Sequence, residues 1–169
     1  MVKKLFSSIT LVVLVGIMIA GLAQAATDAV TATVTVIYSA VSLSQETFAY
    51  GSMQSNTASS TLTLWGGAGV VATNDGSTSS FDIYGASTAN YTLAANNTGN
   101  NYIHKFCNTI ASCATPPTNY TALTTSPATL DASVANAETV AFQLQITTPA
   151  TPTNFTQQSA AVTVQASAI

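Results

Sequence analysis

The residue types best suited to chemistry gather in one short stretch that contains His104, Cys107 and Cys113. The cysteines are the only two in the chain and have five residues between them. An even cysteine count favours a disulfide in an oxidising compartment, and closing so small a loop would contribute about 2 kcal/mol. The alternatives are free thiols, or a metal site formed with His104. Zinc needs a fourth ligand or a water, and blue copper usually needs two histidines, so we expect a Cys107–Cys113 disulfide and no metal or other cofactor.

His104 is the only histidine and therefore the only side chain that would ordinarily titrate near neutral pH. It would act as a general base if the fold brought Asp82 or Glu138 beside it. No Gly-x-Ser-x-Gly motif accompanies it, and the six acidic residues are too scattered to indicate a glycosidase pair. We therefore expect no catalytic residue and no enzymatic activity, and a secreted hydrolase ranks third among the functions considered.

Aromatic side chains offer a different chemistry, because their faces stack on sugar rings. Trp65 is the only tryptophan, and with Tyr84, Tyr91 and Tyr102 it would form a platform for a carbohydrate. Burial in a β-sheet core is the commoner role for such residues. Trp65 is the candidate glycan contact, and a carbohydrate-binding or adhesion module is the alternative function.

The N-terminus predicts export. Lys3 and Lys4 precede an apolar run of about 18 residues, and Ala23-Gln24-Ala25 then provides a small-x-small cleavage site. We expect a signal-peptide helix over residues 1–25, cleavage between Ala25 and Ala26, and one domain over 26–169. An uncleaved membrane anchor is the alternative. The expected location is secreted or at the extracellular cell surface, with membrane contact only through the signal peptide before cleavage.

The charge balance excludes several partners. Arginine is absent, and after cleavage Lys105 is the one fixed cation against six carboxylates, which gives a formal charge of −5. Nucleic-acid binding requires clustered cations that displace counterions from phosphates, so it is excluded. Anionic lipid surfaces are excluded for the same reason.

Hydrophobic periodicity predicts that the elements are strands. Val30, Ala32, Val34, Val36 and Tyr38 alternate with hydroxyl or β-branched residues, and the phase changes near Ser39-Ala40, which indicates a bend. Residues 139–146 and 160–167 alternate in the same way, residues 61–64 resemble a short strand, and Asn74-Asp75-Gly76 indicates a hairpin turn. About eight or nine short antiparallel strands with no helical period indicate an all-β fold, a single immunoglobulin-like β-sandwich.

The chain resembles a group of small, exported, Thr/Ser-rich β-sandwich proteins from uncultivated small-genome bacteria, most without assigned function. The stretches that carry the resemblance are 31–34, 48–51, 73–76, 104–107, 143–149, 157–159 and 162–165. It is more remotely similar to immunoglobulin-like surface domains, including WxL-type cell-wall-binding modules, although Trp65 is followed by Gly66-Gly67 where the WxL signature has x-Leu. The resemblance implies a surface sandwich and supplies no catalytic residue.

These features favour a secreted, non-enzymatic cell-surface protein with a structural or adhesive role. One mechanism is assembly by β-strand addition, in which a strand of one subunit pairs with an edge strand of another. The candidate donor is Ala29–Tyr38, which alternates cleanly and carries no charge after Asp28. The alternative is that it pairs within its own sheet. The expected partners are other copies, other surface proteins or glycans.

Overall fold

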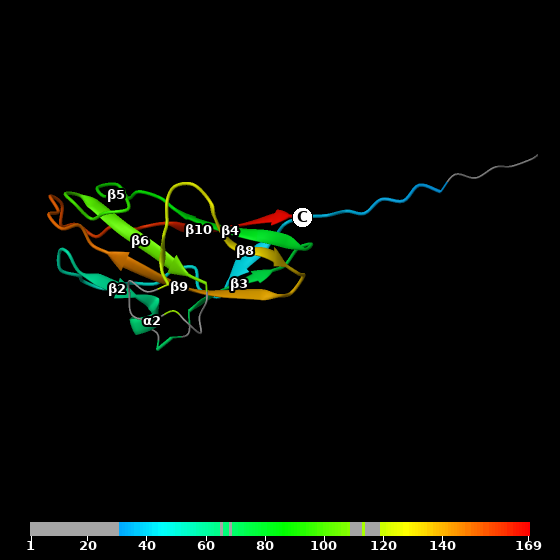
Figure 1. Ribbon diagram of the computed structural model, residues 1–169, viewed down its shortest axis with the longest axis horizontal. Helices are drawn as coiled ribbons and strands as arrows, with labels where there is room; N and C mark the ends of the chain where they lie inside the picture. Colours follow the sequence, from blue (N-terminus) through cyan, green and yellow to red (C-terminus); the bar gives the residue numbers. More distant parts are fainter. Residues whose placement is uncertain (1–30, 65, 68, 109–112, 114–118) are drawn as a thin grey trace, which may run out of the picture. The chain divides into compact units, whose positions relative to one another are not determined.

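The computed structural model describes residues 31–64, 66–67, 69–108, 113 and 119–169. In these residues almost all regular structure is β, arranged in one sheet of seven strands and one of three (Figure 1). The prediction of an all-β sandwich is therefore confirmed. The expected signal-peptide helix lies outside the described residues.

The larger sheet is organised around one long central strand, β9. Its main path runs β1-β3-β9-β6-β5, and β2 and β7 pair with β9 and β6 respectively. The first half of β9 pairs with β3, and its second half lies between β2 and β6. The strand bounds are β1 Val41–Leu43, β2 Ala58–Ser60, β3 Val70–Asn74, β5 Thr92–Leu93, β6 Asn101–Cys107, β7 Thr121–Ala122 and β9 Thr139–Thr147.

The smaller sheet has the order β10-β4-β8, so that β8 and β10 are its two edges. Its strands are β4 Ser79–Gly85, β8 Ala128–Val134 and β10 Val162–Ala168. Every second residue of β4 is buried, as a half-covered strand requires.

The main hydrophobic core lies between the two sheets. Phe81 and Ile83 of β4 and Phe106, Phe142 and Leu144 of the larger sheet are all buried members of one cluster. These side chains occupy alternate positions of their strands, which is why all of them face inward. Burying each contributes about 1.5–3 kcal/mol.

Two local features differ from the prediction. Residues Thr61–Leu64 form a single helical turn, α2, and not a strand, because the hydroxyl oxygen of Ser60 accepts a hydrogen bond from the Thr63 N–H (3.3 Å) and caps the turn. A pattern of two leucines is too short to fix a period. The described residues contain ten strands, and β5 pairs with β6 in parallel, so the larger sheet is not purely antiparallel.

The turn at Asn74-Asp75-Gly76 forms, but it joins β3 of one sheet to β4 of the other and does not close a hairpin. The side-chain oxygen of Asn74 accepts a hydrogen bond from the Gly76 N–H (2.9 Å). A Cβ at Gly76 would lie 2.5 Å from the Tyr38 carbonyl oxygen, so only glycine fits there.

Residues 36–169 form one compact unit, and the described residues 31–35 belong to a second unit. No part of 31–40 is in a strand, so the predicted strand over Ala29–Tyr38 is wrong for the residues that the structure describes. At Ser39-Ala40, where the sequence predicts a bend, the chain contacts the β3–β4 turn. The Ser77 N–H donates to the Tyr38 carbonyl there (2.8 Å). A search of the described residues finds no helix long and apolar enough to cross a membrane.

Candidate functional site

A groove with a volume of about 1320 Å³ opens along one side of the sandwich, and we call it the side groove. Its floor is formed by Tyr102 and His104 of β6 and by Leu144 and Ile146 of β9. The antiparallel register places His104 opposite Ile146, so these side chains share one face of the larger sheet. Phe106, further along β6, belongs to the main core cluster, whereas Tyr102 and His104 do not. The groove therefore lies where the inner face of the larger sheet extends beyond the main core.

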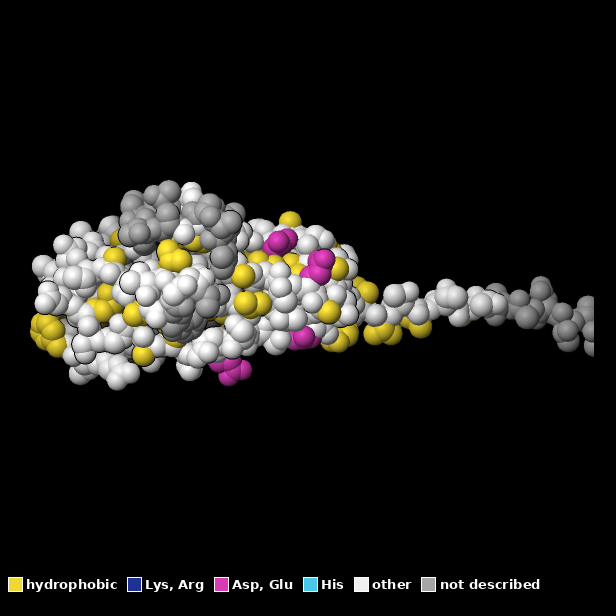
Figure 2. Space-filling view, turned by 90° about the horizontal axis from the view of Figure 1, so that it is seen from below, with side chains coloured by type: hydrophobic (Ala, Val, Ile, Leu, Met, Phe, Trp, Pro, Cys, Tyr) yellow, Lys and Arg dark blue, Asp and Glu magenta, His cyan; other side chains and the backbone are white. Residues whose placement is uncertain are grey.

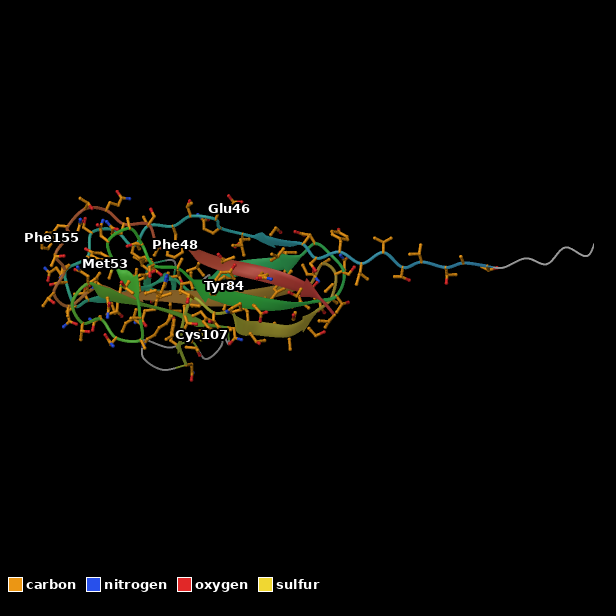
Figure 3. All side chains as sticks on the ribbon, turned by 90° about the horizontal axis from the view of Figure 1, so that it is seen from above. Glu46, Phe48, Met53, Tyr84, Cys107 and Phe155 are labelled. Carbon is orange, nitrogen blue, oxygen red and sulfur yellow. A yellow bond between two sulfur atoms is a disulfide. The ribbon has the colours of Figure 1, made fainter. Side chains whose placement is uncertain are left out.

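The two walls of the side groove come from distant parts of the sequence. Residues 45–55, which contain no regular strand, form one wall, and residues 155–162 and the first half of β10 form the other. Phe48 and Tyr50 make an edge-to-face ring contact at 4.8 Å and consolidate the first wall. Figure 3 shows Glu46, Phe48 and Met53 along this segment and Phe155 near one end of the molecule.

His104 is 2% exposed, and its Nε2 lies 3.1 Å from the Tyr50 hydroxyl. Burial lowers the pKa of His104 to about 4, because the apolar surroundings disfavour the imidazolium. Burial likewise raises the pKa of Tyr102 to about 12 and that of Tyr50 well above its usual value. All three side chains are therefore neutral at physiological pH, and the floor of the groove is uncharged.

Neither of the two predicted acidic partners, Asp82 and Glu138, is hydrogen-bonded to His104. The Glu138 carboxylate accepts a hydrogen bond from the Ala135 N–H (2.8 Å) in the turn before β9. Asp82 lies on β4 between the core residues Phe81 and Ile83, and so on the opposite face of that strand. A histidine with a pKa near 4 and no orienting acid is poorly suited to act as a general base near pH 7.

The predicted disulfide is confirmed. Cys107 and Cys113 are bonded with an S–S distance of 2.03 Å and a Cα–Cα distance of 5.9 Å. Both thiols are consumed by this bond, so neither is available to a metal together with His104. Over the described ranges, no group of three His, Cys, Asp or Glu side chains is placed to hold a metal ion. Cys107, Cys113 and Tyr120 form a small apolar cluster of their own.

The predicted aromatic platform is only partly assembled. Tyr91 and Tyr102 both line the side groove, and the Tyr91 hydroxyl donates to the Asn154 carbonyl. Tyr84 lies on β4, opposite Thr163 of β10, and does not line the groove. Trp65, the candidate glycan contact, lies outside the described residues.

The candidate donor residues separate into two groups. Val30 and the expected cleavage residues Ala25 and Ala26 lie outside the described part of the chain. Ala32, Val34 and Val36 are described, exposed and in no strand. Tyr38 is held by the β3–β4 turn, since its hydroxyl donates to the Asp75 carbonyl (2.6 Å).

Sequence reasoning did not identify the groove walls. Phe48 lies in the stretch 48–51 that carries the resemblance, but nothing in that stretch indicates a groove, and Met53 and Phe155 belong to no motif. Comparisons of the chain with protein-family models, with curated proteins and with solved structures find no match.

Proposed function

We propose that this protein is a non-enzymatic structural subunit of an extracellular surface assembly whose copies are joined by β-strand addition. The observation that carries the proposal is the state of residues 31–38, which we call the N-terminal segment. Its sequence is that of a half-buried strand, yet Val34 is 88% exposed and Val36 is 79% exposed. The segment therefore has the pattern of a strand, but among the described residues no second strand pairs with it and no surface covers its apolar side chains.

The backbone of this segment is also available. Across the described residues 31–37, no backbone hydrogen bond pairs the segment with a strand. Strand addition would satisfy both the backbone and the side chains of the segment. An edge strand offers backbone donors and acceptors, and a neighbouring groove receives alternate side chains. The uncharged residues of the segment present no electrostatic barrier to this pairing.

An extracellular location is supported by two features. The Cys107–Cys113 disulfide is of the kind that persists in oxidising compartments, and the first 25 residues have the pattern of a signal peptide. Figure 2 shows a face that carries few charged side chains, the acidic ones being scattered. A surface with so little charge suits packing between like copies, since like charges would repel.

A carbohydrate-binding module is the second candidate function. The observation that favours it is that Tyr91 and Tyr102 line the side groove together with the polar side chains of Thr88 and Gln158. Retention on a glycan array that is lost in Tyr91→Phe, which removes only the hydroxyl, or in Tyr91→Ala would support this function. Equal retention by all three proteins would contradict it.

The test of the proposed function is removal of residues 31–36 from the full chain, which leaves the contacts of Tyr38 in place. We expect the unaltered protein to form regular oligomers or filaments in size-exclusion chromatography and negative-stain microscopy, and the deletion variant to be a folded monomer. The matched control replaces the same six residues with Thr, Ser and Gly in equal length. Assemblies that persist in the deletion variant would contradict the proposal, as would an unaltered protein that stays monomeric.

A further inference from the structure

We propose that the side groove of one copy is the acceptor for the N-terminal segment of a second copy, which adds to the free edge of β10. This inference rests on the proposed function and specifies its docking site. The inserted strand lies between β10 and the wall of residues 45–55. Its even-numbered side chains face the groove floor, and its threonines face solvent.

The free edge of β10 follows from the hydrogen bonds at its two ends. The Ala161 carbonyl accepts from the Ala86 N–H (3.2 Å), and the Ile169 N–H donates to the Thr78 carbonyl (3.1 Å), so the backbone groups of both residues point toward the neighbouring β4 side. Backbone groups alternate in direction along a strand. Those of Val162 and Val164 therefore point the other way, and β4 is the one strand that pairs with β10 in the described residues.

The backbone of Ala168, near the end of β10, agrees with this alternation. The Ala168 N–H donates to the Ser39 hydroxyl (2.7 Å) on the side away from β4, which closes the last position of the free edge. The open part is therefore the first half of β10. This is also the part that borders the side groove, since residues 157–162 and Val164 line it.

The free edge of β10 is shorter than the N-terminal segment. Seven residues of extended chain span about 23 Å, whereas the open part of the edge begins at Val162 and the wall before it, residues 157–161, is in no strand. Residues 31–37 are therefore long enough to pair with the open part of the edge and to continue along the wall. Tyr38 is held by Asp75 and Ser77, so it marks the end of the part that is free to pair.

The chemistry of the groove matches an apolar, uncharged strand. Tyr102 and His104 at its floor are already buried and uncharged. The surface that it offers to Val34 and Val36 consists of the half-buried apolar side chains of Phe48, Ile146 and Val162. Among the described residues that line it, Glu46 is the one Asp, Glu, Lys or Arg. A charged peptide would gain no ion pair at the floor and would lose hydration, whereas the N-terminal segment loses only exposed apolar surface.

The structure favours a second copy over the same chain as the donor. Tyr38 and Ala40 are hydrogen-bonded to the β3–β4 turn, next to Ala168 at the far end of β10 from Val162. These bonds fix Tyr38 at one end of β10, whereas the open half lies at the other end, and the segment of a second copy is under no such constraint. The other edge strand of the smaller sheet, β8, carries Asp131. It is a less suitable acceptor, because a charge on an edge opposes strand addition.

Cysteine pairing between separate chains tests the docking site directly. Side chains directly opposite each other on paired strands have Cβ atoms about 4.5–5.5 Å apart, near the range that a disulfide bridges. We expect a mixture of full-length Val34→Cys and Val162→Cys proteins to form an intermolecular disulfide, identified by mass spectrometry, at least tenfold more than a mixture in which Ser133→Cys on β8 replaces Val162→Cys. Equal cross-linking to both edges would overturn the inference.

A second pair of variants separates this inference from the proposed function. Ala160 lines the groove, so a lysine there blocks it. Thr163, on β10 itself, is exposed and does not line the groove, so a lysine there points to solvent. We expect Ala160→Lys to abolish assembly and Thr163→Lys to preserve it, with the thermal unfolding of both unchanged. Assembly by both variants that is still lost on deletion of residues 31–36 would overturn the groove as acceptor and leave the proposed function standing. A double variant Val34→Cys/Val162→Cys that closes as a monomer would overturn the second copy as donor.

Discussion

Strand β9 and the N-terminal segment have nearly the same sequence pattern but opposite structural states. In β9, Val140, Phe142 and Leu144 alternate with polar or small residues and are buried. In the N-terminal segment, Val34 and Val36 alternate with threonines and are exposed. β9 has strands on both sides, whereas the described residues of the N-terminal segment are in no strand. Alternation thus determines which side chains share a face, but a partner determines whether the strand forms.

The physical reason is that a single strand gains little by forming alone. Ordering one residue of backbone costs about 1–2 kcal/mol, and an isolated strand makes no ladder hydrogen bonds that offset this cost. Burial of a valine side chain contributes about 1.5–3 kcal/mol only when a second surface covers it. The N-terminal segment therefore retains a free energy of pairing that β9 has already gained.

The largest difference between β9 and the N-terminal segment is expected for truncation of a core side chain. Phe142→Ala leaves a cavity and should lower the free energy of unfolding by about 3–5 kcal/mol, as measured by urea denaturation. The matched variant Val36→Ala removes an exposed side chain and should change it by less than about 0.5 kcal/mol. Comparable losses in the two monomers would mean that the N-terminal segment is already packed in its own chain.

A smaller effect is expected from pH, through His104 opposite Ile146 of β9. Burial lowers the pKa of His104 to about 4 from 6.5, so between these values the unfolded chain binds a proton that the folded chain does not. Stability contributed by the neutral histidine is full above pH 6.5 and falls as the pH drops toward 4, by as much as about 3 kcal/mol.

His104→Gln is the control for this pH effect, because it removes the titration and leaves the carboxylates unchanged. Urea unfolding of the unaltered protein should show a loss between pH 6.5 and 4 that the variant lacks. Identical pH profiles for the two proteins would show that His104 is open to solvent, and that the groove floor is not the apolar surface described above.

The disulfide should have a still smaller effect. Cys107→Ala/Cys113→Ala releases the loop that follows β6, the neighbour of β9, and should lower the free energy of unfolding by about 2 kcal/mol. Treatment of the unaltered protein with dithiothreitol should give the same loss. Assembly should persist in both, because the bond lies outside the groove lining; loss of assembly in a folded variant would place the disulfide in the interface.

The smallest effect on folding should accompany a large effect on assembly. Val34→Thr/Val36→Thr keeps β-branched side chains on the N-terminal segment but removes the apolar face. The free energy of unfolding of the monomer should be unchanged within about 0.5 kcal/mol, while sedimentation velocity shows monomers where the unaltered protein forms oligomers. The control substitutions Thr33→Val/Thr35→Val lie on the other face of the N-terminal segment, so the protein that carries them should still assemble.

Much of the fold is predictable from the sequence because the strong alternation of 139–146 and 160–167 leaves one choice of period. The disulfide is predictable for a simpler reason, since only Cys107 and Cys113 are available. Residues 61–64 form a helical turn because Ser60 caps it, and a run of four residues carries no signal strong enough to show this. A long local pattern therefore determines the period, but, as residues 31–38 show, it does not by itself determine whether a strand forms.

The candidate site is less predictable because it depends on contacts between distant segments. The floor of the groove comes from β6 and β9, and its walls come from residues 45–55 and 155–162, none of which has a recognisable motif. The sequence does indicate the proposed donor, through the strand pattern of Val34 and Val36. It does not indicate that the donor lacks a partner in its own chain, because the absence of a neighbouring strand leaves no trace in local periodicity.

Amide hydrogen exchange of the N-terminal segment, measured in separated monomeric and assembled fractions, tests the central claim most directly. We expect residues 31–37 to exchange at unprotected rates in the monomer and to become protected in the assembled fraction. Residues 140–146 of β9 should be protected in both. Residues 31–37 that exchange equally fast in both fractions would contradict the claim that a second copy supplies the partner strand, as would full protection already in the monomer.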